Sequence, residues 1–323
     1  SISRTLTAPW LDGAASDWGY LGLANNHVIG SCQARGASLD ILAKDTINNL
    51  IEGDYRPIIV SHALFSMDPA FGEVRWTYRN GRIANSAVAM DENRVFLLES
   101  RNPEAMANLD GRIRLDVFGA SDAFLTALDL KTGQPLWEPP FAFPYDHVVF
   151  LSFKDGVLLA TGSYNEGNSV YYGLHAFNAD SGAPLWENRF LATNVQGTEP
   201  TGLEGSHGEQ WQHPVLIEDR VFLRPYDFNL HTGAKGTYHL YRGGHGCGGL
   251  TGSLHYLYGR GSNPRMYPVD LETTDGIRLT YTTRPGCYLN MIPAGGLLLI
   301  PESSAGCTCA YSMQTSLAFI PKA

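Results

Sequence analysis

The segment Ala127-Leu-Asp129-Leu-Lys-Thr132-Gly133-Gln-Pro-Leu-Trp137 returns along the chain with its key residues at the same offsets. The best second copy is Ala176-Phe-Asn178-Ala-Asp-Ser181-Gly182-Ala-Pro-Leu-Trp186. An earlier copy, Ser66-Met-Asp68-Pro-Ala-Phe-Gly72-Glu-Val-Arg-Trp76, keeps Asp, Gly and Trp. Two weaker copies without tryptophan lie at Asn229 to Gly233 and at Asp270 to Gly276. The chain therefore contains an internal repeat, and its fold has to be explained from the repeating unit.

The repeat has a direct physical interpretation. Its Asp and Thr side chains can bond to the amides of a tight turn, and its Gly supplies the positive φ that such a turn needs. An alternating strand leads into the turn, and a second strand leaves it and ends in Trp, whose ring is expected to pack against the neighbouring sheet. The five glycines lie 61, 49, 51 and 43 residues apart. This spacing predicts the blades of a β-propeller with loops of variable length.

The repeat resembles the PQQ-type (pyrroloquinoline-quinone) propeller repeat, Ala-x-Asp-x-x-Thr-Gly-x-x-x-Trp. The resemblance implies an all-β fold of four-stranded blades. It implies no bound quinone, because many propellers with this repeat, such as the outer-membrane-assembly lipoprotein scaffolds, carry no cofactor.

Composition limits the class of protein. The 323 residues, 44% of them apolar, suffice for one closed ring, and 35 Gly with 18 Pro suit short strands joined by tight turns. The net charge of −9 argues against nucleic-acid binding. No apolar run is long enough for a membrane span, and the first residues show no signal-peptide pattern, so we expect a soluble chain that begins at a mature N-terminus.

The blades can be traced along the sequence. We expect a single domain over residues 1–323 with about six blades, or seven or eight if the chain is part of a larger ring. One short helix is predicted at 38–54, where apolar residues recur at helical spacing. The region Arg101 to Gly111 has no periodicity and is expected to be a loop. The last blade has no tryptophan-ending strand, and the N-terminal strand around Thr5 to Trp10 can complete it.

The cysteines cluster near the C-terminus. Four of the five, Cys247, Cys287, Cys307 and Cys309, fall within residues 247–323, which favours two disulfides and an oxidising compartment. Cys307 and Cys309 are too close to pair readily with each other. The alternatives are unpaired buried thiols and a Zn or Cu site that includes His245, although the chain has no Cys-x-x-Cys pair. Cys32 is expected to be a small buried side chain.

The C-terminal third resembles a second group. Its segments Gly246-Cys247-Gly, Arg284-Pro-Gly-Cys287 and Gly306-Cys307-Thr-Cys309 are similar to signatures of secreted bacterial PQQ-like-repeat proteins. That resemblance supports the fold and a periplasmic or extracellular location, but it implies no activity.

Several side chains of this region are candidates for ligand binding, namely Arg242, His245, Arg260, Arg284, Asn290 and Glu302. Glu302, Asn290 and Asp270 offer the oxygen ligands of a Ca²⁺ and PQQ site, although their spacing is not that of a quinoprotein. The basic side chains together with Tyr256 could line a polysaccharide-cleaving site. His207 and His213 form a further pair, with polar loop residues as the plainer interpretation.

We therefore expect a binding scaffold without a cofactor. Its partner is a protein or an extracellular ligand, held by the loops on one face of the propeller. Because the fold alone implies no reaction, the alternative is a propeller enzyme with a channel site, either a quinoprotein-type oxidoreductase or a polysaccharide-active enzyme.

Overall fold

The computed structural model describes residues 5–9, 13–38, 57–142, 144–167, 169–192, 212–240, 249–260, 263–270, 276–281, 283, 285–286, 291–301 and 315–320. These residues form two compact units. The first extends to Tyr164 and includes residues 173–187, and the second comprises residues 165–172 and the chain from Asn188 onward.

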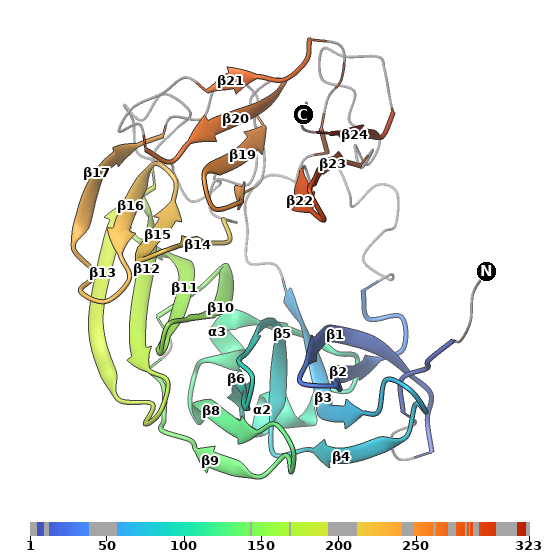
Figure 1. Cartoon of the computed structure of the whole chain (residues 1–323). Helices are drawn as coiled ribbons and strands as arrows, with labels where there is room; N and C mark the ends of the chain where they lie inside the picture. The colour runs from blue at the N-terminus through green and yellow to red at the C-terminus, as the bar shows by residue number, and fades with distance from the viewer. Residues whose placement is uncertain are drawn as a thin grey trace, which may run out of the picture. The chain divides into compact units, whose positions relative to one another are not determined.

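The first unit is built on one large antiparallel sheet (Figure 1). Its order is β1-β2-β3-β5-β6-β8-β9, and β4 and β7 also pair with β3. Two four-stranded groups, β1 to β4 and β5-β6-β8-β9, meet where β3 pairs with β5. The strands are β1 (Ser16–Ala24), β2 (His27–Ala34), β3 (Pro57–Met67), β4 (Val74–Tyr78), β5 (Arg82–Met90), β6 (Arg94–Ser100), β7 (Arg112–Arg114), β8 (Ala123–Asp129) and β9 (Pro135–Trp137).

The described residues form four further sheets, three of them with four strands and one with three (Figure 1). A four-stranded sheet whose residues are divided between the units contains β10 (Val148–Lys154), β11 (Val157–Glu166), β12 (Ser169–Asn178) and β13 (Pro184–Leu191). The second unit has β14 (Val215–Ile217), β15 (Arg220–Leu223), β16 (Tyr226–Asn229) and β17 (Lys235–His239) as one sheet.

The second unit ends in two sheets that carry the site described below. One has the strands β18 (Thr251–Gly252), β19 (Tyr256–Arg260), β20 (Pro264–Pro268) and β21 (Ile277–Arg278) in sequence order. The other, with three strands, has β22 (Ile292–Ala294), β23 (Leu297–Ile300) and β24 (Leu317–Phe319). All these pairings are antiparallel.

The repeated Asp/Asn turn is held by its own side chain. In the turn after β8, Asp129 Oδ1 accepts hydrogen bonds from the amides of Lys131 (3.1 Å) and Thr132 (2.8 Å) and from the Thr132 hydroxyl (2.8 Å). Asn178 and Asn229 form the same bonds in their turns. Each turn ends at a glycine with positive φ, 70° at Gly133. The turn therefore forms from bonds within four residues.

The repeated tryptophan connects successive turns of the first unit. Trp76 Nε1 donates to Leu130 O (2.9 Å), and Trp137 Nε1 donates to Ala179 O (3.2 Å). A Cβ placed on Gly133 would lie 2.6 Å from Trp76 Cδ2, so the turn glycine leaves the space that the indole fills. Each tryptophan thus packs on the turn of the next repeat.

The core of the first unit consists of apolar side chains that face each other between its strands. The largest cluster includes Phe96, Leu98, Leu125 and Leu151, and Trp137 packs against it. A second cluster, around Ile29, Leu64 and Leu97, includes Trp76 at its border. The tryptophans therefore join the turns to the core.

Residues 5–9 form no strand and lie against the first sheet. Leu6 packs with the cluster of Val28, Cys32, Phe65 and Met67. The Ser16 hydroxyl donates to Pro9 O at 2.5 Å, which fixes the end of the segment.

These observations confirm the predicted fold class, an all-β protein of four-stranded antiparallel blades. The strands β1 and β2 form a hairpin joined at Asn25 and Asn26. The loop predicted at Arg101 to Gly111 was wrong, because it contains α2 (Pro103–Ala107), and α3 (Leu115–Phe118) follows it. Helices of five and four residues are too short to show periodicity. Most of the predicted helix at 38–54 lies outside the described residues, and the blade count and the single domain stay predictions.

Candidate functional site

The strongest candidate site is an apolar cleft between the last two sheets of the second unit. Two of its lining residues, Tyr258 and Leu298, are each 8% exposed and belong to a buried cluster that also includes the almost fully buried Met291 and Ile300. The cleft has a volume of about 510 Å³, which lies in the usual range for ligand pockets.

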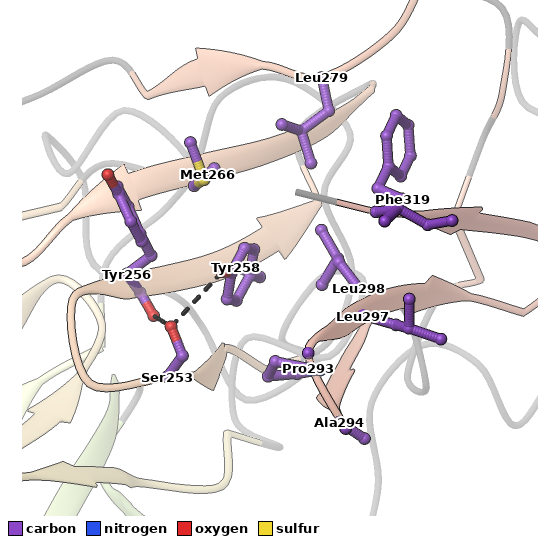
Figure 2. A pocket seen from close by; sticks show the side chains of 13 residues that line it. Ser253, Tyr256, Tyr258, Met266, Leu279, Pro293, Ala294, Leu297, Leu298 and Phe319 are labelled. Atoms are coloured by element: carbon purple, nitrogen blue, oxygen red, sulfur yellow. Dashed lines mark hydrogen bonds between the residues drawn. The ribbon is translucent and has the colours of Figure 1, made fainter. Parts of the chain in front are cut away.

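One wall comes from β19, β20 and the end of β21 (Figure 2). Tyr256 and Tyr258 are two residues apart on β19 and therefore project from the same face of the strand. Met266 on β20 is the direct cross-strand partner of Tyr258, and cross-strand partners share a face. Leu279 completes this wall, held by the bond from its amide to Pro264 O (3.0 Å).

The opposite wall is a row across the three-stranded sheet (Figure 2). Pro293 on β22 pairs with Leu298 on β23, and Leu298 pairs with Phe319 on β24. The turn between β22 and β23 consists of Gly295 and Gly296, both with positive φ, and both glycines line the cleft. The cleft therefore opens beside a loop of the second unit.

The edge of the cleft is apolar and in part exposed. Ile320 is 77% exposed, and Tyr256 and Leu297 are half-buried. The Ser253 hydroxyl lies 3.4 Å from both Tyr256 O and the Tyr258 hydroxyl. None of the thirteen described residues that line the cleft carries a charge. This arrangement suits the binding of apolar side chains and supplies no acid, base or nucleophile apart from hydroxyl groups.

The first unit has a different pocket, of about 500 Å³, with a histidine in its wall. The buried Tyr145 hydroxyl donates to Ala160 O (3.0 Å) and lies 2.7 Å from His175 Nδ1, so His175 donates its Nδ1 proton to Tyr145. Burial lowers the pKa of His175 and raises that of Tyr145, which leaves both neutral at pH 7. His175 Nε2 lies 4.0 Å from the exposed carboxylate of Glu187.

A buried carboxylate of the first unit has a structural role. Glu99 accepts hydrogen bonds from the Tyr78 hydroxyl (2.8 Å), the Thr126 hydroxyl (3.1 Å) and the Arg101 guanidinium (2.5 Å). Burial, with the neighbouring Glu99 carboxylate, raises the pKa of Tyr78. Arg101 also pairs with Glu138 and lies over the Phe124 ring. The Arg101 guanidinium compensates the charge of the buried Glu99 carboxylate, and the bonds from Tyr78 and Thr126 to Glu99 join β4, β6 and β8.

The structure describes only some of the side chains that the sequence singled out. Arg260 is buried, 1% exposed, at the end of β19, and it is not among the residues that line the cleft. Cys32 is a buried free thiol whose pKa is raised by burial. His213 Nδ1 lies 2.7 Å from Pro214 O. The other candidates lie outside the described residues, namely Arg242, His245, Arg284, Asn290, Glu302, His207, Cys247, Cys287, Cys307 and Cys309.

The motif residues Asp68, Gly72, Trp76, Asp129, Gly133, Trp137, Asn178, Gly182 and Trp186 lie in the turns and in the strands beside them. Sequence reasoning missed Tyr258, Met266, Leu298 and Phe319 as parts of one cleft, and Tyr145 and His175 as a pair. The alternation of Tyr256 and Tyr258 was a visible signal for a strand with one aromatic face. Nothing in the sequence indicated which sheet that face would meet.

The described residues were also tested against a metal or quinone site. Among them, no group of three or more His, Cys, Asp or Glu side chains is placed to hold a metal ion. Asp270 is the one predicted Ca²⁺ ligand within the described ranges. It lines a pocket with Asp219 and Asp227, and Asp227 is already bonded to Arg220 Nε (2.8 Å) and the Tyr238 amide (3.0 Å). These residues do not fit such a site, and the absence of a cofactor stays a prediction.

In the described part of the chain, no helix has the length and apolar character needed to cross a membrane.

Comparison with known proteins supports the repeat. The family model described as outer membrane protein assembly factor BamB matches residues 121–233. Over these residues the repeat is similar to that of this family. The match includes the turns at Asp129, Asn178 and Asn229 and the tryptophans Trp137 and Trp186. The expected PQQ-type resemblance is thereby confirmed, whereas the Gly-Cys-Thr-Cys signature stays a prediction.

A curated relative is similar over part of its length. The outer membrane protein assembly factor BamB of Burkholderia pseudomallei (strain K96243) is 29% identical over 142 residues, which are 43% of this chain and 33% of the relative. The chain thus spans about a third of the length of the curated relative it matches.

Two solved structures are similar at low sequence identity. BamB from Moraxella catarrhalis has 12% identity and a TM-score of 0.44, with 92% of this chain and 86% of that chain covered. Quinohemoprotein alcohol dehydrogenase from Comamonas testosteroni has 10% identity and a TM-score of 0.45, with 87% of this chain and 51% of that chain covered.

Proposed function

We propose that this chain is a protein-binding scaffold that takes part in outer-membrane protein assembly, located in the periplasm. The BamB-type repeat at residues 121–233 and the relative named as an assembly factor support this role. The single observation that carries the binding mode is the uncharged cleft of the second unit. An extracellular location, the other expectation from the sequence, has no support in the comparisons.

The cleft supplies what a protein anchor needs. Protein interfaces gain most of their affinity where a few large apolar side chains enter a well-packed pocket. A volume of about 510 Å³ admits one or two such side chains. Ile320 stands at the edge with 77% of its surface exposed, where a partner would cover it. Because Gly295 and Gly296 line the cleft, binding would use a loop end of these sheets, in line with the expected loop face.

Site-specific photo-crosslinking tests this proposal. The full chain with benzoylphenylalanine at position 320 is irradiated with an outer-membrane envelope fraction, and the adduct is identified by mass spectrometry. The control places the same group at His231, an exposed turn residue that does not line the cleft. We expect position 320 alone to crosslink a protein of outer-membrane assembly.

A direct measurement must follow the identification. The purified partner should bind the full chain, and Ile320→Asp should weaken binding about tenfold or more, because it places a charge against an apolar anchor. His231→Asp should leave the affinity unchanged. Equal crosslinking from both positions, or an unchanged affinity of Ile320→Asp, would refute the cleft as the binding site.

The alternative function, a propeller enzyme with a channel site, depends on residues of the C-terminal third. Apart from Arg260, Tyr256 and Asp270, the residues that suggested a quinone or polysaccharide site lie outside the described ranges. The two disulfides expected among the four C-terminal cysteines stay a proposal. They agree with the proposed periplasmic location, because the periplasm is an oxidising compartment.

A further inference from the structure

The turns of the first unit act as receptors for an indole. At Gly133 and Gly182 the missing side chain leaves space that Trp76 and Trp137 occupy, and a Cβ there would lie 2.6 and 2.7 Å from the indole carbons. The indole N–H then bonds to the carbonyl of the residue after the turn's Asp or Asn, Leu130 or Ala179. Each receptor therefore consists of a bare glycine and a carbonyl acceptor.

The first turn, residues 68–72, is built in the same way. Gly72 has a φ of 75°, and its amide bonds to Asp68 O (2.8 Å). Asp68 Oδ1 accepts from the amides of Ala70 (2.7 Å) and Phe71 (2.9 Å). The equivalent acceptor is Pro69 O. The backbone of an indole receptor is therefore complete at this turn.

The occupant of this turn is different. The group nearest to a Cβ on Gly72 is Leu6 Cδ2, at 2.9 Å, and Leu6 belongs to the strandless segment 5–9. Within the described ranges, Pro69 O accepts no hydrogen bond. A leucine side chain has no donor, so it fills the space over the glycine and leaves the carbonyl unused.

At this turn, exposed apolar side chains stand at positions where the other copies of the repeat have different residues. Where the other turns have Thr132, Ser181 or Thr232, whose hydroxyls bond to the turn's Asp or Asn, this turn has Phe71. Phe71 has no hydroxyl group and cannot form that bond, and its side chain is 70% exposed. Two residues after the glycine, β4 begins with Val74, which is 43% exposed, whereas Pro135, Pro184 and Lys235 begin the corresponding strands β9, β13 and β17.

The same face of the sheet has further exposed apolar groups. The register joins Leu23, Val28, Met67 and Val74 in one row across β1 to β4, and such partners share a face. Leu23 is 69% exposed, while Val28 and Met67 are buried. Leu23 and Val74 are therefore exposed apolar side chains at the two ends of one row on this face.

We propose that this surface, made of the 68–72 turn with Leu23 and Val74, docks a tryptophan-bearing segment of a partner protein. The partner's indole displaces Leu6 from Gly72 and donates to Pro69 O, and apolar residues beside it contact Phe71 and Val74. The indole is the occupant because the same turn holds an indole twice in the same unit, with the same bond. The inference rests on the proposed role in protein binding and adds a surface separate from the cleft.

A second copy of this chain does not supply that indole from its described tryptophans. Trp76 and Trp137 already donate their N–H groups to the next turn, and Trp18 packs on Phe65 with ring centroids 5.2 Å apart. The half-buried Trp186 lines the pocket beside His175. To release Trp76 or Trp137 would break the contacts between repeats, and to release Trp18 or Trp186 would remove its packing within the protein. A partner with an exposed tryptophan pays no such cost.

A labelled peptide tests the dock. The probe is the chain's own segment 132–140, Thr-Gly-Gln-Pro-Leu-Trp-Glu-Pro-Pro, whose binding to the full chain is followed by fluorescence anisotropy, beside the same peptide with alanine in place of tryptophan. We expect the tryptophan peptide to bind at least tenfold more tightly. Leu6→Ala, which removes the competing side chain, should tighten its binding about tenfold.

The Phe71→Thr variant distinguishes a loss of peptide binding from a loss of folding. It restores the residue type of the other turns, so the melting temperature should be kept while peptide binding falls several-fold. Leu136→Ala, at an exposed position of another repeat, should leave peptide binding unchanged and lower the melting temperature by no more than about 2 °C. Equal binding of the two peptides, or no effect of Leu6→Ala and Phe71→Thr, would overturn the proposal.

Two more variants separate the partner from the chain itself. If Trp10→Ala or Trp211→Ala tightens peptide binding as Leu6→Ala does, a tryptophan of this chain fills the dock, and the proposal of a partner is refuted. Unchanged binding in both variants supports it. Failure of the peptide test leaves the crosslinking result at position 320 unaffected, so the two proposals can fail separately.

Discussion

Removal of the Trp137 indole should weaken the first unit far more than truncation of its exposed neighbour Leu136. The ring lies over Gly182, donates its N–H to Ala179 O and has its centroid 6.0 Å from that of Phe96. Trp137→Ala therefore removes a contact between repeats, a hydrogen bond and an aromatic neighbour at once.

The magnitude follows from these contacts. Truncation of a buried aromatic residue to alanine costs about 3–5 kcal/mol, and Trp137 is half-buried, so the lower end, about 3 kcal/mol, is expected. The hydrogen bond accounts for about 1 kcal/mol of this loss. Trp137→Phe keeps most of the ring contact and should cost about 1–1.5 kcal/mol. Leu136→Ala, at a side chain 53% exposed, should cost about 0.5 kcal/mol or less.

Calorimetry and urea unfolding measure the effect. At about 2–4 °C per kcal/mol for a unit of this size, Trp137→Ala should lower the transition of the first unit by about 6–12 °C. Leu136→Ala should lower it by no more than about 2 °C. The reasoning fails if Trp137→Ala costs no more than Leu136→Ala. It also fails if Trp137→Phe costs as much as Trp137→Ala, because the ring contact would then contribute nothing.

Two further predictions concern the turn and the buried histidine. Asp129→Ala should cost about 1 kcal/mol, because it leaves the amides of Lys131 and Thr132 without their acceptor. Asp129→Asn should be nearly neutral, since Asn178 forms the same bonds in its own turn. Thermal unfolding of both variants measures the two losses of stability, and equal losses would contradict the prediction. Burial lowers the pKa of His175, so below the unfolded pKa of about 6.5 the unfolded chain binds a proton that the folded chain does not. Stability should therefore fall as the pH drops through that value, and His175→Gln should reduce this slope in urea unfolding at pH 5 to 8; an unchanged slope would contradict the assignment.

The sequence alone was enough to identify the repeat and its turns. The bonds from Asp129 to Lys131 and Thr132, and the positive φ of Gly133, involve residues within four positions of each other, so residue types at fixed offsets determine them. The hairpins followed from alternation and turn residues for the same reason. The short helix α2 was missed because its signal is one local cap, Asn102 before Pro103, with no periodic face behind it.

Only the tertiary structure determined where the faces of these strands lie. Trp76 reaches Leu130 O, Tyr145 meets His175, and the Tyr258 side of the cleft faces Leu298, all between residues 30 or more positions apart. The replacement of an indole by Leu6 at Gly72 was equally invisible in the repeat, since Gly72 and Asp68 are present there as in the other copies. Offsets in a sequence determine bonds within a turn, whereas contacts between sheets depend on loop lengths and on how whole apolar faces pack, which no local pattern encodes.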